Sequence, residues 1–241
     1  HNGASVSPAP YSNQTAWVSD NIGAQEGSSV SVAGGRVFVN CVDRLVCLNQ
    51  SSGQMLWNAS FAPTPDICQA WGFSPAYDDG KVFLSGMKTV CLNASDGGEQ
   101  WSFAPPTGRG GVDGGPAVSG GRVIVGDWDG HHYYCLDEET GRELWNFNVE
   151  GNAQSTPAID EGKAIFAGWE WGLGGKIYCV GLDDGSEIWN LSTKNSPCGS
   201  AALSRDVAYL TTYSFEGDGD VIAVSLENGS LLWEKSIART D

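Results

Sequence analysis

Tryptophans that stand beside carboxylates are the residues of this chain whose types best suit ligand binding. Indole rings stack on sugars and peptides, and neighbouring carboxylates accept hydrogen bonds from the same ligands. The candidate ligand-binding residues are Trp71, Trp128, Trp169, Trp171, Asp127 and Asp129. They fall in predicted loops, outside the regular positions of the repeat described below, so blade packing does not require them. The alternative is that long loops fold their own aromatic rings over the end of the molecule.

A second candidate site is an acidic run near the C-terminus. Glu216, Asp218 and Asp220 alternate with glycines, and carboxylate oxygens so arranged can surround a hard cation such as calcium. The run lacks the full EF-hand pattern. Calcium is therefore the one cofactor that the sequence suggests, and the alternative is a solvated acidic loop.

The motifs of common catalytic sites are missing from the sequence. The only histidines are His1, His131 and His132. There is no zinc-protease motif, no phosphate-binding glycine loop with lysine, no Gly-x-Ser-x-Gly nucleophile and no haem-attachment motif. His131 and His132 open a predicted strand, so their side chains point to opposite faces and do not form a paired metal site. We therefore predict that the protein is not an enzyme.

The seven cysteines fall into two groups. Cys47, Cys91, Cys135 and Cys179 follow one another at 44-residue intervals, with Ala223 at the next step. We predict that these four are buried small residues that lie too far apart to bridge. Cys41, Cys68 and Cys198 depart from this spacing. The loops of Cys41 and Cys68 are expected on one face of adjoining blades, so we predict a Cys41–Cys68 disulfide; the alternative is three thiols.

Asparagine gives the clearest indication of the compartment. Six of the 13 asparagines lie in N-x-S/T sequons, namely Asn13, Asn49, Asn58, Asn93, Asn190 and Asn228. Such sequons are the acceptors of N-glycosylation in secreted proteins. We expect the shared turn position of Asn49 and Asn93 and the shared outer-strand position of Asn58 and Asn190 to be exposed. Extracellular glycosylation is the prediction; the alternative is that a repeat copies accidental sequons.

A fixed repeat must position all of these residues. Five Gly-x-x-x-Trp units recur at an interval of 44 residues, and their tryptophans are Trp57, Trp101, Trp145, Trp189 and Trp233. Asn13 and Trp17 form a sixth, degenerate copy of the unit. The glycine can take the positive φ that closes a tight hairpin. The tryptophan offers a large apolar surface that can be buried against a neighbouring unit.

Each repeat predicts four short strands and no helix. In the third repeat the expected strands are residues 116–119, 122–126, 131–137 and 142–149, rich in Val, Ile, Tyr and Trp and bounded by Gly and Asp. Four strands in a unit of about 40–45 residues are typical of a β-propeller blade. The predicted fold is an all-β propeller of four-stranded antiparallel blades, with five complete blades and an extra N-terminal outer strand.

The segments GGPAVSGGRVIVGDWDG, YYCLDEETGRELW and VCLNASDGGEQW resemble the PQQ-like β-propeller repeat family. That family includes quinoprotein alcohol dehydrogenases and the propeller lipoprotein of outer-membrane assembly. The opening SPAPYSNQTAW is similar to the segment before the propeller in archaeal surface members. The resemblance implies a PQQ-dependent dehydrogenase as the least favoured function, since the adjacent Cys-Cys pair of many such enzymes has no counterpart here.

Composition excludes several kinds of partner. The net charge is −16, from 13 basic and 29 acidic residues. A surface that tracks the phosphates of nucleic acid, or that binds anionic lipid, is therefore not expected. No apolar run approaches the length of a membrane span. We expect an extracellular or cell-surface location.

How the ring closes is left open by the sequence. We expect an N-terminal extension over residues 1–12 and one propeller domain over residues 13–241. Five blades and the strand around Trp17 leave a sixth blade without inner strands. Either the natural chain continues past Asp241, or five blades close, or a neighbouring subunit donates or receives the strand. We predict a surface assembly module, with self-association in a filament or sheath or with other surface proteins; a glycan- or peptide-binding propeller is the alternative.

Overall fold

The computed structural model describes residues 14–24, 29–41, 44–60, 74–86, 88–107, 114–170, 172–214 and 217–237. All regular secondary structure in these segments is β-strand, and none of them contains a helix that could cross a membrane. The strands form antiparallel sheets in which consecutive strands are neighbours. The predicted all-β propeller of four-stranded blades is therefore confirmed.

Five blades follow one another along the chain. Blade 1 contains β1 (Ser31–Ala33), β2 (Arg36–Asn40), β3 (Arg44–Asn49) and β4 (Met55–Ser60). Blade 2 contains β5 (Ala76–Asp78), β6 (Lys81–Leu84), β7 (Thr89–Asn93) and β8 (Glu99–Phe103). Blade 3 contains β9 (Ala117–Ser119), β10 (Arg122–Asp127), β11 (His132–Asp137) and β12 (Glu143–Asn148). Blade 4 contains β14 (Ala158–Asp160), β15 (Lys163–Glu170), β16 (Gly174–Gly181) and β17 (Glu187–Thr193), with the short β13 (Asn152–Ala153) also paired to β15. Blade 5 contains β18 (Ala202–Ser204), β19 (Val207–Thr211), β20 (Gly219–Ser225) and β21 (Leu231–Ile237).

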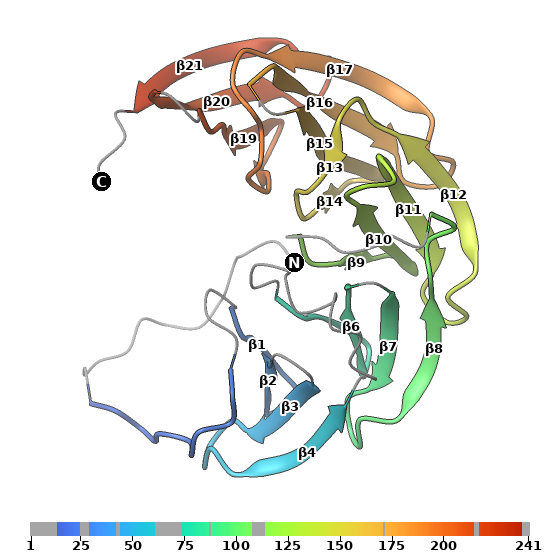
Figure 1. The fold of residues 1–241 in the computed structure, drawn as a ribbon, viewed down its shortest axis with the longest axis vertical. Helices are drawn as coiled ribbons and strands as arrows, with labels where there is room; N and C mark the ends of the chain where they lie inside the picture. Colours follow the sequence, from blue (N-terminus) through green and yellow to red (C-terminus); the bar gives the residue numbers. More distant parts are fainter. Residues whose placement is uncertain are drawn as a thin grey trace.

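The blades are arranged along an open arc (Figure 1). The fourth strands β4, β8, β12, β17 and β21 follow its outer rim, while β9 and β14 lie near its centre. The N-terminal and C-terminal blades stand apart at the opening. Residues 14–24 continue the outer rim beyond blade 1 (Figure 1), and we call them the N-terminal segment.

The hairpin before each fourth strand repeats the same local chemistry. Its glycine has a positive φ in every blade, from 68° at Gly141 to 78° at Gly97. A polar side chain at the end of the third strand holds the turn: the Asn49 Oδ1 accepts from the Ser51 amide, and the Asp137 Oδ1 accepts from the Thr140 amide. These bonds favour the turn locally, before any contact between blades forms.

Apolar layers between successive sheets form the core. One layer joins Phe38, Leu45 and Cys47 of blade 1 to Val82 and Leu92 of blade 2. Equivalent layers join the later blades in sequence order. The four regularly spaced cysteines and Ala223 are fully buried at 0% exposure. The prediction that this position holds small buried residues is therefore confirmed.

Basic side chains at one strand position contact the next blade. Lys81, at the start of β6, lies within 3.3 Å of Glu138 and 2.6 Å of Glu139 in the next blade. The same strand position holds Arg122, which pairs with Asp183, and Lys163, whose Nζ donates to the Leu226 carbonyl. Blade 5 has Val207 at this position.

Two glycines of blade 3 separate the turn requirement from the packing requirement. A Cβ on Gly141 would lie 2.5 Å from the Trp101 ring, whereas a Cβ on Gly121 would meet nothing within 4 Å. Both residues have positive φ. We expect Gly121→Ala to cost about 1–2 kcal/mol of unfolding free energy from backbone strain, and Gly141→Ala to cost about 2 kcal/mol more because the indole must move. Urea denaturation measures both, and equal losses would contradict the packing account.

Candidate functional site

One contact joins each blade to the next. The indoles of Trp57, Trp101, Trp145 and Trp189 lie on the turn glycines of the following blades, at 2.7 Å or less from the Cβ that another residue would place there. Each indole Nε1 also donates to the carbonyl three residues before that glycine, at 2.8–3.1 Å. We call this arrangement the tryptophan-docking contact. The same glycine thus closes its own hairpin and receives the ring of the preceding blade.

The N-terminal segment makes the same contact without belonging to a described blade. The Trp17 ring covers Gly53, and its Nε1 donates to the Gln50 carbonyl at 2.8 Å. Trp17 and Ile22 pack on the face of blade 1 that turns away from blade 2. Trp17 therefore lies where the tryptophan of a preceding outer strand would lie. Residues 14–24 form only an isolated backbone bridge between Ala24 and Cys41, so the predicted N-terminal outer strand is not formed there; Asn13 lies outside the described residues.

The tryptophan of blade 5 has no receiving turn among the described residues. Trp233 is 47% exposed, whereas Trp101, Trp145 and Trp189 are 7–8% exposed. Its ring lies 6.0 Å from Tyr209 at 46°, and Phe38 and Trp57 of blade 1 form the equivalent pair at 6.0 Å and 44°. Phe38 is fully buried, while Tyr209 is 37% exposed. Blade 5 thus carries an inter-blade face that no other described blade covers.

We call this surface the open face of blade 5. The register places Tyr209 opposite Ala223 and Ala223 opposite Trp233. Since alternate residues of a strand share a face, Thr211 and Val221 lie on the same surface. None of the five residues on this surface is acidic: they are Tyr209, Thr211, Val221, Ala223 and Trp233. Exposed aromatic surface of this kind marks an interaction site more often than scattered apolar residues do.

The structure brings together only part of the predicted ligand site. Trp128 is half-buried and its ring meets Trp169 edge to face at 6.0 Å. Trp169 lies within β15 rather than in a turn, and it is 3% exposed. The loop placement predicted for Trp169 is therefore corrected, because β15 and β16 extend further than their counterparts in other blades. Trp71 and Trp171 lie outside the described residues.

The two aspartates beside Trp128 differ in role. Asp127 is fully buried. Its Oδ2 accepts from the Thr107 hydroxyl at 2.6 Å, and its Oδ1 accepts from the Gly130 amide at 3.2 Å. It therefore holds the hairpin between β10 and β11. Asp129 is exposed on the same hairpin.

Asp220 of the predicted cation site is bound by the protein's own donors. Its carboxylate accepts from Ser236 at 2.7 Å, Asn195 at 2.6 Å and Thr212 at 3.2 Å. The Ser236 hydroxyl first, and then Asn195 and Thr212, lower the pKa of the Asp220 carboxyl below its ordinary value. Asp218 is exposed, and Glu216 lies outside the described residues. Among the described residues, no group of three side chains is placed to hold a metal ion.

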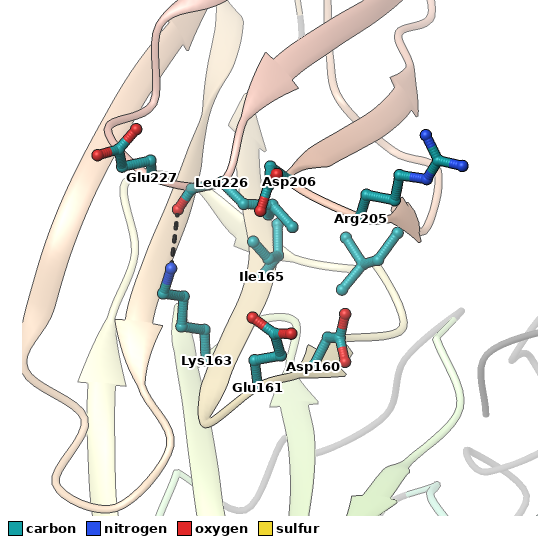
Figure 2. A pocket seen from close by; sticks show the side chains of 9 residues that line it. Asp160, Glu161, Lys163, Ile165, Arg205, Asp206, Leu226 and Glu227 are labelled. Carbon is teal, nitrogen blue, oxygen red and sulfur yellow. Dashed lines mark hydrogen bonds between the residues drawn. The ribbon is translucent and has the colours of Figure 1, made fainter.

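A pocket of about 310 Å³ lies between blades 4 and 5 (Figure 2). Its charged lining comes from the hairpin turns of both blades: Asp160, Glu161, Lys163, Arg205, Asp206 and Glu227. The Leu226 carbonyl accepts from Lys163 (Figure 2). It also accepts from the Trp189 Nε1, so the pocket adjoins a docking contact. Sequence reasoning missed it because its residues come from turns of separate strands and form no motif.

Comparison with known proteins decides the family. A family model described as "Outer membrane protein assembly factor BamB" matches residues 4–102 and 86–241. The chain belongs to this BamB family. The resemblance to PQQ-like propeller repeats is thereby confirmed.

Solved structures that share this fold carry the names of proteins with different functions. BamB from Moraxella catarrhalis aligns with a TM-score of 0.67 at 18% identity, over 87% of this chain and 61% of that one. A europium-containing methanol dehydrogenase aligns with a TM-score of 0.74 at 15% identity, over 93% and 53%. At these identities the likeness shows the fold alone.

Curated relatives share only a stretch of sequence with this BamB family chain. A quinohemoprotein alcohol dehydrogenase from Comamonas testosteroni is 31% identical over an alignment of 144 residues that covers 48% of this chain and 20% of the enzyme. The serine/threonine-protein kinase AfsK from Streptomyces griseus is 27% identical over an alignment of 149 residues that covers 57% of this chain and 18% of the kinase. The chain thus spans about a fifth of the length of these relatives.

The cysteines of this BamB family chain are mostly core residues. Burial raises the pKa of the Cys47 and Cys179 thiols to about 11 and of the Cys91 and Cys135 thiols to about 12. Such thiols are poor nucleophiles. Cys41 is buried directly after β2, and its backbone forms an isolated antiparallel β-bridge with Ala24. Cys68 lies outside the described residues, so the Cys41–Cys68 disulfide stays a prediction.

The sequons occupy two different environments. Asn58 and Asn190 are exposed on the outer strands β4 and β17. Asn49 and Asn93 are half-buried and hold their turns, as Asp137 does without a sequon. The prediction that Asn49 and Asn93 are exposed is therefore only partly confirmed. Asn228 is exposed, and Asn13 lies outside the described residues.

The Asp220 network predicts a pH-dependent contribution to stability. Because its folded pKa is lowered, the carboxylate stabilises the fold above the ordinary value of 3.8, and this contribution is lost as the pH falls through the folded pKa. We expect Asp220→Asn to cost about 2 kcal/mol at pH 7 and less below about pH 3, since bonds to a charged acceptor are stronger. Urea denaturation at both pH values measures this, with exposed Asp160→Asn as control. A cost that does not change with pH would contradict it.

Proposed function

We propose that this protein is a non-enzymatic propeller module that acts in protein assembly outside the cytoplasm through the open face of blade 5. The observation that carries the proposal is the Tyr209–Trp233 pair. It repeats the geometry of the buried Phe38–Trp57 pair, yet it is 37% and 47% exposed at its two rings. An aromatic pair arranged for burial stabilises most when another protein surface covers it.

The family is consistent with a role in protein assembly, but it also includes enzymes. The matching family model is described by an outer-membrane protein assembly factor, whereas several relatives are dehydrogenases. The residues fit a quinone cofactor poorly. The seven cysteines include no adjacent pair, and the four regularly spaced ones are buried between sheets at 0% exposure. An interaction role is the function that agrees with both the family and the exposed surface.

Site-specific crosslinking in cells tests this function. A photoreactive phenylalanine analogue at Tyr209 should give an adduct of higher mass, because the ring lies within the covered surface. The same analogue at Ile188 is the matched control, since Ile188 is 44% exposed on the outer strand of blade 4. Trp233→Asp should abolish the Tyr209 adduct. A Tyr209 variant that stays at the mass of the single chain, or an equal adduct at Ile188, would contradict the proposal.

A location outside the cytoplasm has its own test. Asn58 and Asn190 are exposed sequons on outer strands, away from the layers between blades. We expect glycans at these two positions in protein purified from its natural source. Intact mass before and after deglycosylation, with Asn58→Gln and Asn190→Gln as comparisons, measures their presence. An unmodified mass would remove this part of the proposal.

Ligand binding at Trp128 is the second candidate function. The half-exposed Trp128 ring is fixed edge to face by Trp169, and exposed Asp129 follows it. A rigid aromatic ring beside a carboxylate suits a sugar or a peptide. Glycan-array binding that Trp128→Ala lowers at least tenfold, with folding unchanged, would support this role. Binding that is the same in Trp128→Ala and the parent would exclude it.

A further inference from the structure

We infer that the pocket between blades 4 and 5 binds the arginine side chain of a partner protein. This site goes beyond the proposed assembly surface, since neither Tyr209 nor Trp233 lines it. Its volume of about 310 Å³ lies at the lower end of the range for ligand pockets, which suits one long side chain better than a large cofactor. Both of its walls come from described blades of this chain.

The repeat is broken at the turn that forms one wall of the pocket. A two-residue turn joins the first two strands of each blade. In blades 1–4 its second residue is a glycine with positive φ, namely Gly35, Gly80, Gly121 and Gly162. Blade 5 has Asp206 there, and its positive φ is at Arg205, at 52°. Of the five turns, the one in blade 5 thus adds a carboxylate at this position, and that carboxylate lines the pocket.

The ion pair that joins earlier blades at this position is not formed between blades 4 and 5. In blades 3 and 4, Arg122 lies 3.5 Å from Asp183. Glu227 stands 44 residues after Asp183, where the partner of Lys163 would be. Instead the Lys163 Nζ donates to the Leu226 carbonyl at 3.2 Å, and Figure 2 shows the Glu227 carboxylate turned away from it. The space between the two blades therefore stays open.

Three exposed carboxylates surround this space. Asp160 and Glu161 come from blade 4, and Asp206 comes from blade 5 (Figure 2). Within the described segments, none of the three side chains accepts a hydrogen bond or forms an ion pair. They differ in this from Asp127 and Asp220, whose oxygens accept from the protein's own donors. The three carboxylates are therefore free to accept hydrogen bonds from a ligand.

The two basic residues of the lining leave these carboxylates unneutralised. The Lys163 ammonium is directed toward the Leu226 carbonyl, and the Arg205 guanidinium points outward, away from the labelled carboxylates (Figure 2). The lining thus presents negative charge to an occupant. The whole chain has a net charge of −16, which attracts basic partners and repels acidic ones.

A guanidinium fits the arrangement better than a metal ion does. Among the described residues, no three acidic, histidine or cysteine side chains are placed to hold one metal ion. A guanidinium is planar and carries five N–H donors in a fixed fork, so it can bridge carboxylates that do not converge on one point. Ile165 and Leu203 add apolar surface to the lining, against which the aliphatic stem of an arginine can pack.

The acidic lining also favours an arginine within a polypeptide over the free amino acid. Free arginine would bring its own α-carboxylate close to Asp160, Glu161 and Asp206, and like charges at short distance repel. In a polypeptide that carboxylate is part of a neutral peptide bond. The occupant is therefore the side chain of a protein or peptide.

A titration with blocked peptides tests the occupant. The probe is acetyl-Gly-Arg-Gly-amide, and the matched control replaces arginine by citrulline, which has nearly the same shape and no charge. Backbone amide chemical shifts of the full chain should change saturably in residues 160–163 and 203–206. The citrulline peptide should bind at least tenfold more weakly, because hydrogen bonds from a charged donor are the stronger ones. Unchanged shifts in these residues, or equal affinity for both peptides, would overturn the inference.

A pair of variants assigns the binding to the pocket. Asp206→Gly gives blade 5 the residue that the other four turns have, so the hairpin can still form while the carboxylate is lost. We expect this variant to bind the arginine peptide at least fivefold more weakly. Asp79→Asn removes an exposed carboxylate from the corresponding turn of blade 2 and should leave the affinity unchanged. Equal losses in both variants would show attraction by overall charge and would overturn the inference.

A third variant separates this inference from the proposed function. Trp233→Asp changes the open face of blade 5 and should bind the arginine peptide as the parent does. Retained peptide binding in a protein that gives no crosslink at Tyr209 would leave the pocket standing without the assembly function. Loss of peptide binding in folded Trp233→Asp would place the contact on the open face and overturn the inference.

Discussion

A tryptophan ring that rests on a glycine is the constraint on which the rest of this structure depends. At Gly141 a Cβ would lie 2.5 Å from the Trp101 ring, and the same glycine has a φ of 68°. The residue therefore meets two demands at once, since it closes a hairpin and leaves room for an indole. A tyrosine or leucine in place of the tryptophan would lack the Nε1 donor for the Glu138 carbonyl. Local turn geometry and contact between blades are thus fixed by one pair of residues.

This pairing explains why the repeat keeps a fixed length. The ring must reach a turn in the next blade, so the spacing between Trp and the following Gly is set by the geometry of two sheets. Sequence periodicity predicted the four strands, the buried cysteine position and the role of glycine in the turn. It did not predict that Trp101 and Gly141 are partners, because a repeat pattern gives spacing along the chain and not contacts across blades.

The candidate site was less accessible to sequence reasoning. Asp127 and Asp220 look like ligand-binding carboxylates in the sequence, yet each accepts hydrogen bonds from neighbouring side chains or amides that lie far along the chain or across a hairpin. Trp169 was assigned to a turn because nothing local marks the longer β15. Trp233 looks like every other regular tryptophan, and only the arrangement of blades reveals that it lies uncovered. Exposure of a regular position thus depends on the neighbouring blade, which the repeat pattern does not show.

The central claim is that Trp233 is an unfilled docking contact in the isolated chain. Exchange of the indole Nε1 protons with solvent, followed by nuclear magnetic resonance on the purified protein, tests it most directly. The account predicts slow exchange for Trp101, Trp145 and Trp189, whose Nε1 groups donate to buried carbonyls, and fast exchange for Trp233. Exchange at Trp233 as slow as at these three would contradict the account.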